Sequence, residues 1–312
     1  MNANKGIAIA VIGPGLVGQQ VLYQLSNLPD STVALYGKFM VKAIANSKSM
    51  FLILDDTFDS LKDQNETRSF LNDKGEPVNL NKLCSFLLET NSAASVIIDC
   101  SSSEVLAQQY PHWLSLGINI VTPNKKALSS KFELFQQIKM ETMKRKVFCY
   151  HESTVGAGLP VLDTLKNMVD SGDQVLKIEG ILSGTISYIF NSFATNDKTF
   201  SQIVHEAKKL GYTEPDPRDD LNGMDIARKT LILARMCGFK IEMNDIKVDK
   251  ILPQGYIFQQ DSINVEDFMS ELVKCDQYFA TMKENAKKQS KVLKFVSTVD
   301  VIGKKFSVCL KE

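Results

Sequence analysis

The amino-acid sequence predicts an α/β protein with two domains: a Rossmann-type doubly wound parallel sheet over residues 1–150, followed by an α+β domain over residues 151–312. A chain of 312 residues exceeds the ~250 residues at which single hydrophobic cores stop growing. Its first half alternates short β-branched runs with helical patterns, which is typical of a parallel sheet covered by helices. Beyond residue 150 this alternation ends, so we expect two separate cores.

The composition favours a protein that acts on small molecules. The chain has 36 basic and 36 acidic residues, so no net charge attracts nucleic acid or an anionic membrane. Its six cysteines include no CxxC pair, which in a chain of this size is typical of a reducing, cytoplasmic compartment. No apolar run reaches the ~20 residues that span a bilayer. We expect a cytoplasmic protein with a small-molecule partner, no nucleic-acid partner and no membrane partner.

The first half supplies the strands and helices of the predicted parallel sheet. Residues 6–12 form a β-branched run bounded by glycine, which predicts a buried parallel strand. Further strands are predicted at "STVALYG" (31–37), "FLIL" (51–54), "SVIIDC" (95–100) and "GINIVTP" (117–123). Helical patterns lie between them at 80–90 and 104–117.

The second half begins with a helix over residues 159–172, which carries proline at its start and glycine at its end. The stretch 174–193 predicts a strand, then glycine, then a mixed apolar segment. Residues 220–238 form a strongly helical run that ends at Gly238. The last segment, 291–312, predicts a β-hairpin with "IGKK" as its turn.

Three glycines, Gly13, Gly15 and Gly18, lie between the first strand and a helical pattern. In a dinucleotide-binding turn the first glycine permits the tight turn, the second admits the pyrophosphate and the third allows helix and strand to pack closely. The alternative is a tight strand-to-helix turn without a ligand. The predicted cofactor contacts in this stretch are Gly13, Pro14, Gly15, Leu16, Val17 and Gly18.

A residue that recognises the ribose is expected ~20 positions further on, at the end of the second strand. Counting from Gly18 reaches Lys38, not an acid. A cation there would attract a 2′-phosphate and would favour NADP over NAD. The alternative is that Lys38 is a solvated loop lysine.

Five carboxylates crowd into one proline-punctuated segment of the second half: Glu214, Asp216, Asp219, Asp220 and Asp225. Such a concentration of negative charge is unfavourable unless a cation, such as a substrate ammonium, binds there. The alternative is acid enrichment at a helix N-terminus, which accounts for Asp219 or Asp220 but not for all five. Lys229 follows Asp225 by four residues, so both lie on one helix face, either as a functional amine beside the acids or as a surface ion pair.

Lys125 and Lys126 follow a predicted strand and therefore lie at the carboxyl edge of the sheet, where α/β proteins bind ligands. Charge alone does not choose between them. Ser101 follows another strand at the same edge and is a candidate cofactor contact. Its neighbour Cys100 is interpreted as a buried strand-end cysteine rather than a nucleophile.

Four longer stretches, together with the glycine turn, carry a family resemblance over nearly the whole chain. They are "TPNKKA" (122–127), "HESTVGAGLP" (151–160), "IEGILSGTISYIFN" (178–191) and "LGYTEPDPRDDLNGMDIARK" (210–229). In this order and spacing they closely resemble homoserine dehydrogenases. The resemblance implies reversible NAD(P)-dependent reduction of aspartate semialdehyde to homoserine, in threonine, methionine and isoleucine biosynthesis. It also implies a homodimer formed through the second domain.

The resemblance implies roles for individual residues. Lys229 would be the general acid/base, Lys125 the active-site lysine near nicotinamide and substrate, and Asp220 the support of the lysine environment. Substrate contacts would come from Glu214, Asp225, Gly184 and Thr185, and a further cofactor contact from Gly211. Relatives use the segment around Glu152, with Val155, Ala157 and Leu159, to hold a monovalent cation such as sodium.

The sequence departs from the family pattern at its end. Family members continue past the last hairpin with a Gly/Ala-rich segment that completes the cofactor cleft, whereas this sequence ends at "KKFSVCLKE". The alternative expectation is therefore a truncated, non-catalytic nucleotide-binding or dimerisation relative.

Overall fold

The computed structural model describes residues 6–54, 64–253 and 263–312. The chain forms two compact units, residues 1–159 (unit 1) and residues 160–312 (unit 2). Residues 151–159, which the sequence analysis assigns to the second domain, therefore pack with unit 1. In the described residues no helix is both long enough and apolar enough to cross a membrane.

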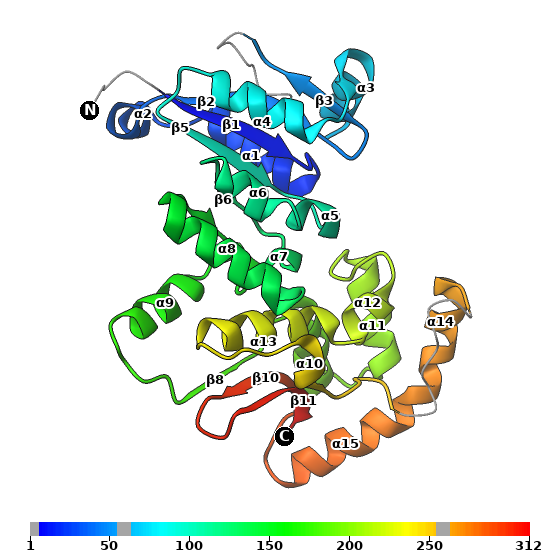
Figure 1. Cartoon of the computed structure of the whole chain (residues 1–312). Helices are drawn as coiled ribbons and strands as arrows, with labels where there is room; N and C mark the ends of the chain where they lie inside the picture. Colours follow the sequence, from blue (N-terminus) through cyan, green and yellow to red (C-terminus); the bar gives the residue numbers. More distant parts are fainter. Residues whose placement is uncertain (1–5, 55–63, 254–262) are drawn as a thin grey trace. The chain divides into compact units, whose positions relative to one another are not determined.

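Unit 1 contains a seven-stranded sheet in the order β4-β3-β2-β1-β5-β6-β7 (Figure 1). Its strands are β1 (Ile7–Ile12), β2 (Phe39–Ala45), β3 (Ser49–Leu52), β4 (Glu76–Pro77), β5 (Ala94–Asp99), β6 (Asn119–Val121) and β7 (Cys149–Tyr150). The neighbouring strands β2, β1, β5, β6 and β7 pair in parallel. At one edge, β3 pairs antiparallel with both β2 and β4. The predicted Rossmann-type, parallel-dominated fold is confirmed.

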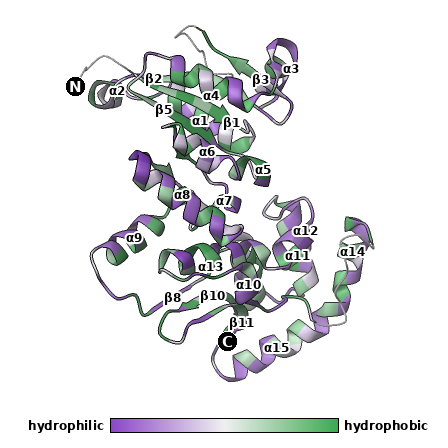
Figure 2. Cartoon of the chain, viewed as in Figure 1, coloured by the Kyte–Doolittle hydropathy of each residue, from purple (hydrophilic) through white to green (hydrophobic). Residues whose placement is uncertain are grey.

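The helices of unit 1 connect these strands. They are α1 (Leu16–Ser26), α2 (Asp30–Tyr36), α3 (Gln64–Lys74), α4 (Leu80–Glu89), α5 (Glu104–Ala107), α6 (Tyr110–Ser115), α7 (Lys126–Ser129) and α8 (Phe132–Arg145), followed by the 3-10 turn η1 (Glu152–Thr154). The core lies between sheet and helices, and β1 and β5 are hydrophobic along most of their length (Figure 2). Buried side chains such as Val11, Leu22 and Ile98 form its centre.

The predicted strand at 31–37 is wrong, because these residues form helix α2. Pro29 precedes the helix with φ −61°, Asp30 lies in its first turn, and Gly37 ends it at φ +87°. These start and stop signals outweigh the β-branched Thr32 and Val33. The second parallel strand is instead β2, which begins two residues after Gly37.

Unit 2 contains a four-stranded sheet in the order β8-β10-β11-β9, with β8 (Lys177–Gly180), β9 (Lys247–Val248), β10 (Lys294–Asp300) and β11 (Lys305–Lys311). Its helices are α9 (Leu162–Asp170), α10 (Gly184–Thr195), α11 (Phe200–Lys209), α12 (Pro217–Leu221), α13 (Met224–Met236), α14 (Val265–Glu271) and α15 (Asp276–Lys288), with 3-10 turns η2 (Met243–Asp245) and η3 (Leu272–Cys275). Helices α13 and α10 pack on this sheet. The predicted C-terminal hairpin is confirmed as the antiparallel pair β10–β11.

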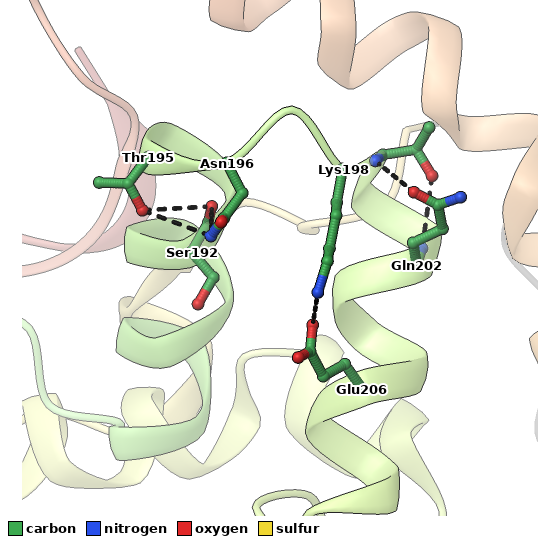
Figure 3. Close-up of polar contacts among 7 residues, drawn as sticks. Ser192, Thr195, Asn196, Lys198, Gln202 and Glu206 are labelled. Carbon is green, nitrogen blue, oxygen red and sulfur yellow. Dashed lines mark hydrogen bonds and ion pairs between the residues drawn. The ribbon is translucent and has the colours of Figure 1, made fainter.

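The connection between α10 and α11 is held by side-chain hydrogen bonds (Figure 3). The Asn196 amide donates to the Ser192 carbonyl at 2.9 Å, at the end of α10. Thr199 and Gln202 form a capping box at the start of α11, and Lys198 pairs with Glu206 at 2.7 Å. Such caps satisfy backbone groups at the helix ends. The opposite end of α10 bears the candidate substrate residues.

Candidate active site

The glycine turn has the close packing that a dinucleotide-binding turn requires. Gly13 adopts φ +81°, and a Cβ there would lie 2.9 Å from the Ser101 backbone nitrogen. A Cβ at Gly18 would lie 2.4 Å from the Gly13 carbonyl oxygen. No side chain therefore fits at these two positions without displacing backbone.

The start of α1 is open to an anion. Gly15, with its amide bonded to the Gly13 carbonyl at 2.8 Å, is the N-cap residue and provides no side-chain cap. Leu16 and Val17 follow in the first turn and are exposed, and Pro14 lies within the turn itself. The N-terminus of an 11-residue helix carries a partial positive charge and backbone N–H groups that suit a pyrophosphate. The turn therefore fits the cofactor that the sequence predicts.

The expectation for Lys38 is corrected by the structure. Lys38 precedes β2, and its carbonyl accepts a hydrogen bond of 2.7 Å from Ile7 at the start of β1. It therefore lies at the amino edge of the sheet, whereas the glycine turn follows the carboxyl end of β1. The seven residues of β2, at about 3.3 Å each, separate Lys38 from that turn by about 20 Å.

The segment Asn46–Ser47–Lys48 lies instead at the end of β2 where a ribose-recognising residue is expected. It follows β2 directly, and the Gly13 amide donates to the Ala45 carbonyl at 2.8 Å. The Asn46 side chain accepts hydrogen bonds from the amides of Lys48 and Ser49 at 2.7 and 2.8 Å, which makes a tight turn into β3. The segment contains no carboxylate, and Lys48 is exposed.

Two further strands end at the same edge of the sheet. The Cys100 amide donates to the Ile12 carbonyl at 2.8 Å, which brings Ser101 beside Gly13. Lys125 lies one turn beyond β6, at the N-cap position of α7, and is half-buried. Burial, with a smaller effect of Asp99, raises the pKa of the Cys100 thiol to about 12, which agrees with a structural rather than a nucleophilic cysteine.

In unit 2, Lys229 lies between an acid and a backbone carbonyl. Its ammonium pairs with the Asp225 carboxylate at 2.6 Å, as the i, i+4 spacing on α13 predicts, and its side chain is only 15% exposed. It also donates a hydrogen bond of 2.6 Å to the Leu182 carbonyl. Because Leu182 immediately precedes the start of α10, Lys229 lies near Gly184 and Thr185.

Asp220, Glu214 and Thr185 form the second part of this cluster. The Asp220 carboxylate accepts a hydrogen bond of 2.8 Å from the Glu214 amide, and Thr185 lies beside it. Burial raises the pKa of Asp220, and the neighbouring carboxylates of Glu214 and Asp219 raise it further. Thr185 donates to the Tyr212 carbonyl at 2.6 Å. The acids therefore repel one another at a point where a substrate cation would relieve the repulsion.

Gly184 is the first residue of the 12-residue helix α10, and a Cβ there would meet no atom within 4 Å. Open space thus adjoins a helix N-terminus, which suits a substrate carboxylate. Gly211 has φ +73° where α11 ends. Its conformation is explained by helix termination, since the Tyr212 amide reaches back to the Ala207 carbonyl at 2.9 Å.

One of the five clustered acids has a structural role. Asp216 caps α12, accepting from the Arg218 amide at 3.0 Å, and its carboxylate accepts three further bonds from the Arg218 guanidinium. Arg218 is buried and stacks over Phe268 at 5.3 Å. The pairing with Arg218 lowers the pKa of Asp216. Asp216 is therefore the helix cap, and Asp219 and Asp220, to which the helix-terminus alternative was applied, lie in the first turn of the same helix.

The candidate cation segment follows β7 in unit 1. Glu152 begins η1, Val155 is buried, and Ala157 has a left-handed φ of +53°. Within the part of the chain that the structure describes, the carbonyls of Val155, Ala157 and Leu159 accept no hydrogen bond. Carbonyl oxygens without partners, next to a carboxylate, are a donor set that suits a hard cation.

Sequence reasoning missed two features of the site. The first is the Leu182 carbonyl, which accepts a hydrogen bond from Lys229. A backbone carbonyl is present in every residue, so no residue type in the sequence indicates this contact. The second is Tyr212, whose carbonyl accepts the Thr185 hydrogen bond and whose ring packs edge-to-face on Tyr188 at 4.9 Å between ring centroids. A cavity of about 280 Å³ elsewhere in unit 2, between the ends of α10 and α15, contains none of the site residues.

The fold and the glycine turn define a two-domain protein whose first unit binds a dinucleotide. Residues 13–152 match the family described as homoserine dehydrogenase, NAD binding domain, and residues 160–312 match homoserine dehydrogenase. A homoserine dehydrogenase of Schizosaccharomyces pombe is 38% identical over the whole chain, which covers 83% of that relative. The chain belongs to the homoserine dehydrogenase family.

Other relatives place the chain within this family. A bifunctional aspartokinase/homoserine dehydrogenase of maize chloroplasts is 39% identical over 98% of the chain, which spans only 32% of that relative. Among solved structures, a Candida auris protein of unknown function is 36% identical, with a TM-score of 0.85 over 99% of this chain and 84% of its own. A homoserine dehydrogenase described as putative, from Archaeoglobus fulgidus, shares the fold, with 22% identity and a TM-score of 0.70 over 98% and 83% of the two chains.

Proposed function

We propose that this protein catalyses reversible NAD(P)-dependent reduction of aspartate semialdehyde to homoserine. The observation that carries the proposal is Lys229, a mostly buried ammonium positioned by Asp225 and the Leu182 carbonyl. An amine in this setting can give a proton to a carbonyl oxygen, or take one from a hydroxyl, at the site where Gly184 and Thr185 begin α10.

The remaining residues of unit 2 bind and orient the substrate. Glu214 and Asp225 hold the substrate ammonium, and the N-terminus of α10 receives its carboxylate. Asp220 accepts a hydrogen bond from the Glu214 amide and supports this charge arrangement. Charges that are fixed before the reaction need no reorganisation during it, which lowers the barrier.

The cofactor occupies unit 1. The α1 N-terminus and the glycine turn hold its pyrophosphate, and Ser101 and Lys125 lie at the same edge of the sheet. When bound, the nicotinamide supplies or accepts the hydride, and Lys125 provides positive charge near the substrate oxygen. A hyperthermophilic archaeal homoserine dehydrogenase of similar fold was solved in complex with NADPH.

We further propose that NADP is preferred over NAD. The turn Asn46–Ser47–Lys48 has no acid that would repel a 2′-phosphate or bind a 2′-hydroxyl. Lys48 is exposed in the turn that follows β2, three residues after Ala45, whose carbonyl bonds to Gly13, and it supplies a cation at this edge of the sheet. The preference for NADP is therefore the same as the one inferred from Lys38, but the residue that we propose for it is Lys48.

Two finer features complete the proposal. A monovalent cation, such as sodium, binds the carbonyls of Val155, Ala157 and Leu159 together with Glu152. A homodimer forms through the unit 2 sheet face opposite α13, where Val296, Thr298 and Cys309 lie. The face on the other side is covered, since Ser297 contacts Thr230 of α13 at 2.8 Å.

The test is turnover of homoserine with NADP and then with NAD, followed by the absorbance of the reduced nicotinamide. Lys229→Ala is expected to lower kcat at least about 100-fold while NADPH affinity stays within about twofold. Lys166→Ala is the matched control, because Lys166 and Asp170 form the same i, i+4 pair on an exposed helix face. Equal loss of turnover and cofactor affinity in Lys229→Ala would mean that Lys229 is structural. Cofactor binding without turnover in the unmodified chain would favour the non-catalytic alternative.

A further inference from the structure

Asp99, at the end of β5, is a fully buried carboxylate held by three hydrogen bonds. One oxygen accepts from the Ser101 amide at 2.8 Å. The other accepts from the Tyr110 hydroxyl at 2.6 Å and from the Asn124 amide at 3.1 Å. Among the described residues no lysine or arginine pairs with Asp99. A buried carboxylate is unfavourable unless such donors are rigidly provided.

Asn124 joins the two loops that follow β5 and β6. Its side-chain amide donates to Asp99 and, at 2.9 Å, to the Ser103 carbonyl in the first loop. Its side-chain oxygen accepts from the Lys126 amide at 3.1 Å in the second loop. The two N–H groups and the oxygen of the Asn124 side chain therefore all form hydrogen bonds. These bonds tie the residue before Lys125 to the first loop and to the residue after Lys125.

Thr122 and Tyr110 close the network. The Thr122 hydroxyl donates to the Asp99 carbonyl at 2.8 Å and accepts from the Asn124 amide at 2.9 Å. The Tyr110 hydroxyl lies 2.9 Å from the Thr122 hydroxyl oxygen. Burial and the neighbouring Asp99 raise the pKa of Tyr110, so its hydroxyl remains a donor.

Lys125 is held from its other side as well. Its carbonyl accepts hydrogen bonds from the Ser129 hydroxyl at 2.8 Å and the Ser129 amide at 3.0 Å. With Asn124 fixed before it and Lys126 bonded after it, the backbone of Lys125 is set by the network.

We propose that Asp99, Tyr110 and Asn124 are positioning residues that lock the β5 and β6 loops together and so place Lys125 and Ser101 for the reaction. This inference rests on the proposed function, which assigns Lys125 to the reacting centre. It explains why a polar network occupies the interior where apolar packing would serve stability alone. A displacement of about 1 Å at a charged group is enough to lower turnover substantially.

The test compares Asn124→Ser and Tyr110→Phe with the control Ser95→Ala. Ser95 is also buried in β5, but its hydroxyl bonds to the Leu87 carbonyl at 3.1 Å, near the amino end of the strand. The two network variants are expected to lower kcat about tenfold or more, and the control less than about twofold. Equal effects in all three would overturn the proposal.

A double-mutant cycle separates positioning from a structural role. In the Lys125→Ala background, adding Asn124→Ser or Tyr110→Phe is expected to change the residual kcat by less than about twofold, because their effect on kcat passes through Lys125, whereas Ser101 is a candidate cofactor contact. Effects that multiply independently would overturn the inference. Tyr110→Phe keeps this cycle usable if Asn124→Ser does not fold.

Amide hydrogen exchange gives a readout that does not need turnover. Faster exchange at Ser101, Ser103 and Lys126 is expected in the network variants and not in Ser95→Ala. If the unmodified chain shows no turnover but exchange follows this pattern, the homoserine activity fails and the locking of the loops stands. Unchanged exchange would overturn the locking itself.

Discussion

Replacing Gly18 by alanine tests the glycine turn directly. The new Cβ would lie 2.4 Å from the Gly13 carbonyl oxygen, 3.1 Å from the Gly13 carbonyl carbon and 3.4 Å from the Cys100 Cβ. Carbon and oxygen normally approach to about 3.3 Å, so α1 must retreat by about 0.9 Å. Overpacking of this kind lowers the free energy of unfolding by about 2–3 kcal/mol. For a unit of this size the melting temperature should fall by about 5–10 °C.

The retreat also moves the α1 N-terminus from the pyrophosphate, so NADPH affinity should fall about tenfold or more, which is at least about 1.4 kcal/mol. Thermal unfolding without cofactor and a fluorescence titration with NADPH measure the two effects separately. Gly158→Ala is the matched control in unit 1, because a Cβ there meets nothing within 4 Å. If Gly18→Ala melts and binds NADPH like the unmodified chain, the close packing of the turn does not matter and the reasoning is refuted.

Three further predictions concern single side chains. Asp216→Asn should lower the free energy of unfolding at pH 7 by about 2–3 kcal/mol, since Arg218 loses its charged partner. Because the folded pKa of Asp216 is lowered from 3.8, this difference should persist above that value and shrink as pH falls below it in chemical denaturation; a constant difference down to pH 2 would contradict the pairing. Cys100, with its pKa near 12, should resist iodoacetamide at pH 8 in the folded chain and react after denaturation, as peptide mapping would show. Lys48→Glu should shift the NADP-to-NAD ratio of kcat/KM towards NAD about tenfold or more, and an unchanged ratio would exclude Lys48 from ribose recognition.

Local signals in the sequence predict much of this protein. Most strands of the first sheet, the helix at α13 and the C-terminal hairpin follow from hydrophobic period and turn residues within a few positions. The i, i+4 relation of Asp225 and Lys229 follows from helix geometry alone. Helix α2 differs from the predicted strand because the Pro29–Asp30 start and the Gly37 stop outweigh its β-branched residues.

The sequence alone determined the family, the glycine turn and the residue types of the candidate site, because these depend on short stretches with their own physical logic. Only the tertiary structure decided that Lys38 lies at the amino edge of the sheet and Asn46–Lys48 at the ligand edge, since counting residues does not reveal which end of a strand the chain has reached. It likewise showed that Asp216 forms an ion pair with Arg218 and that hydrogen bonds to Asp99 connect the loops that follow β5 and β6. Such contacts arise where separate elements meet, and no local pattern encodes them.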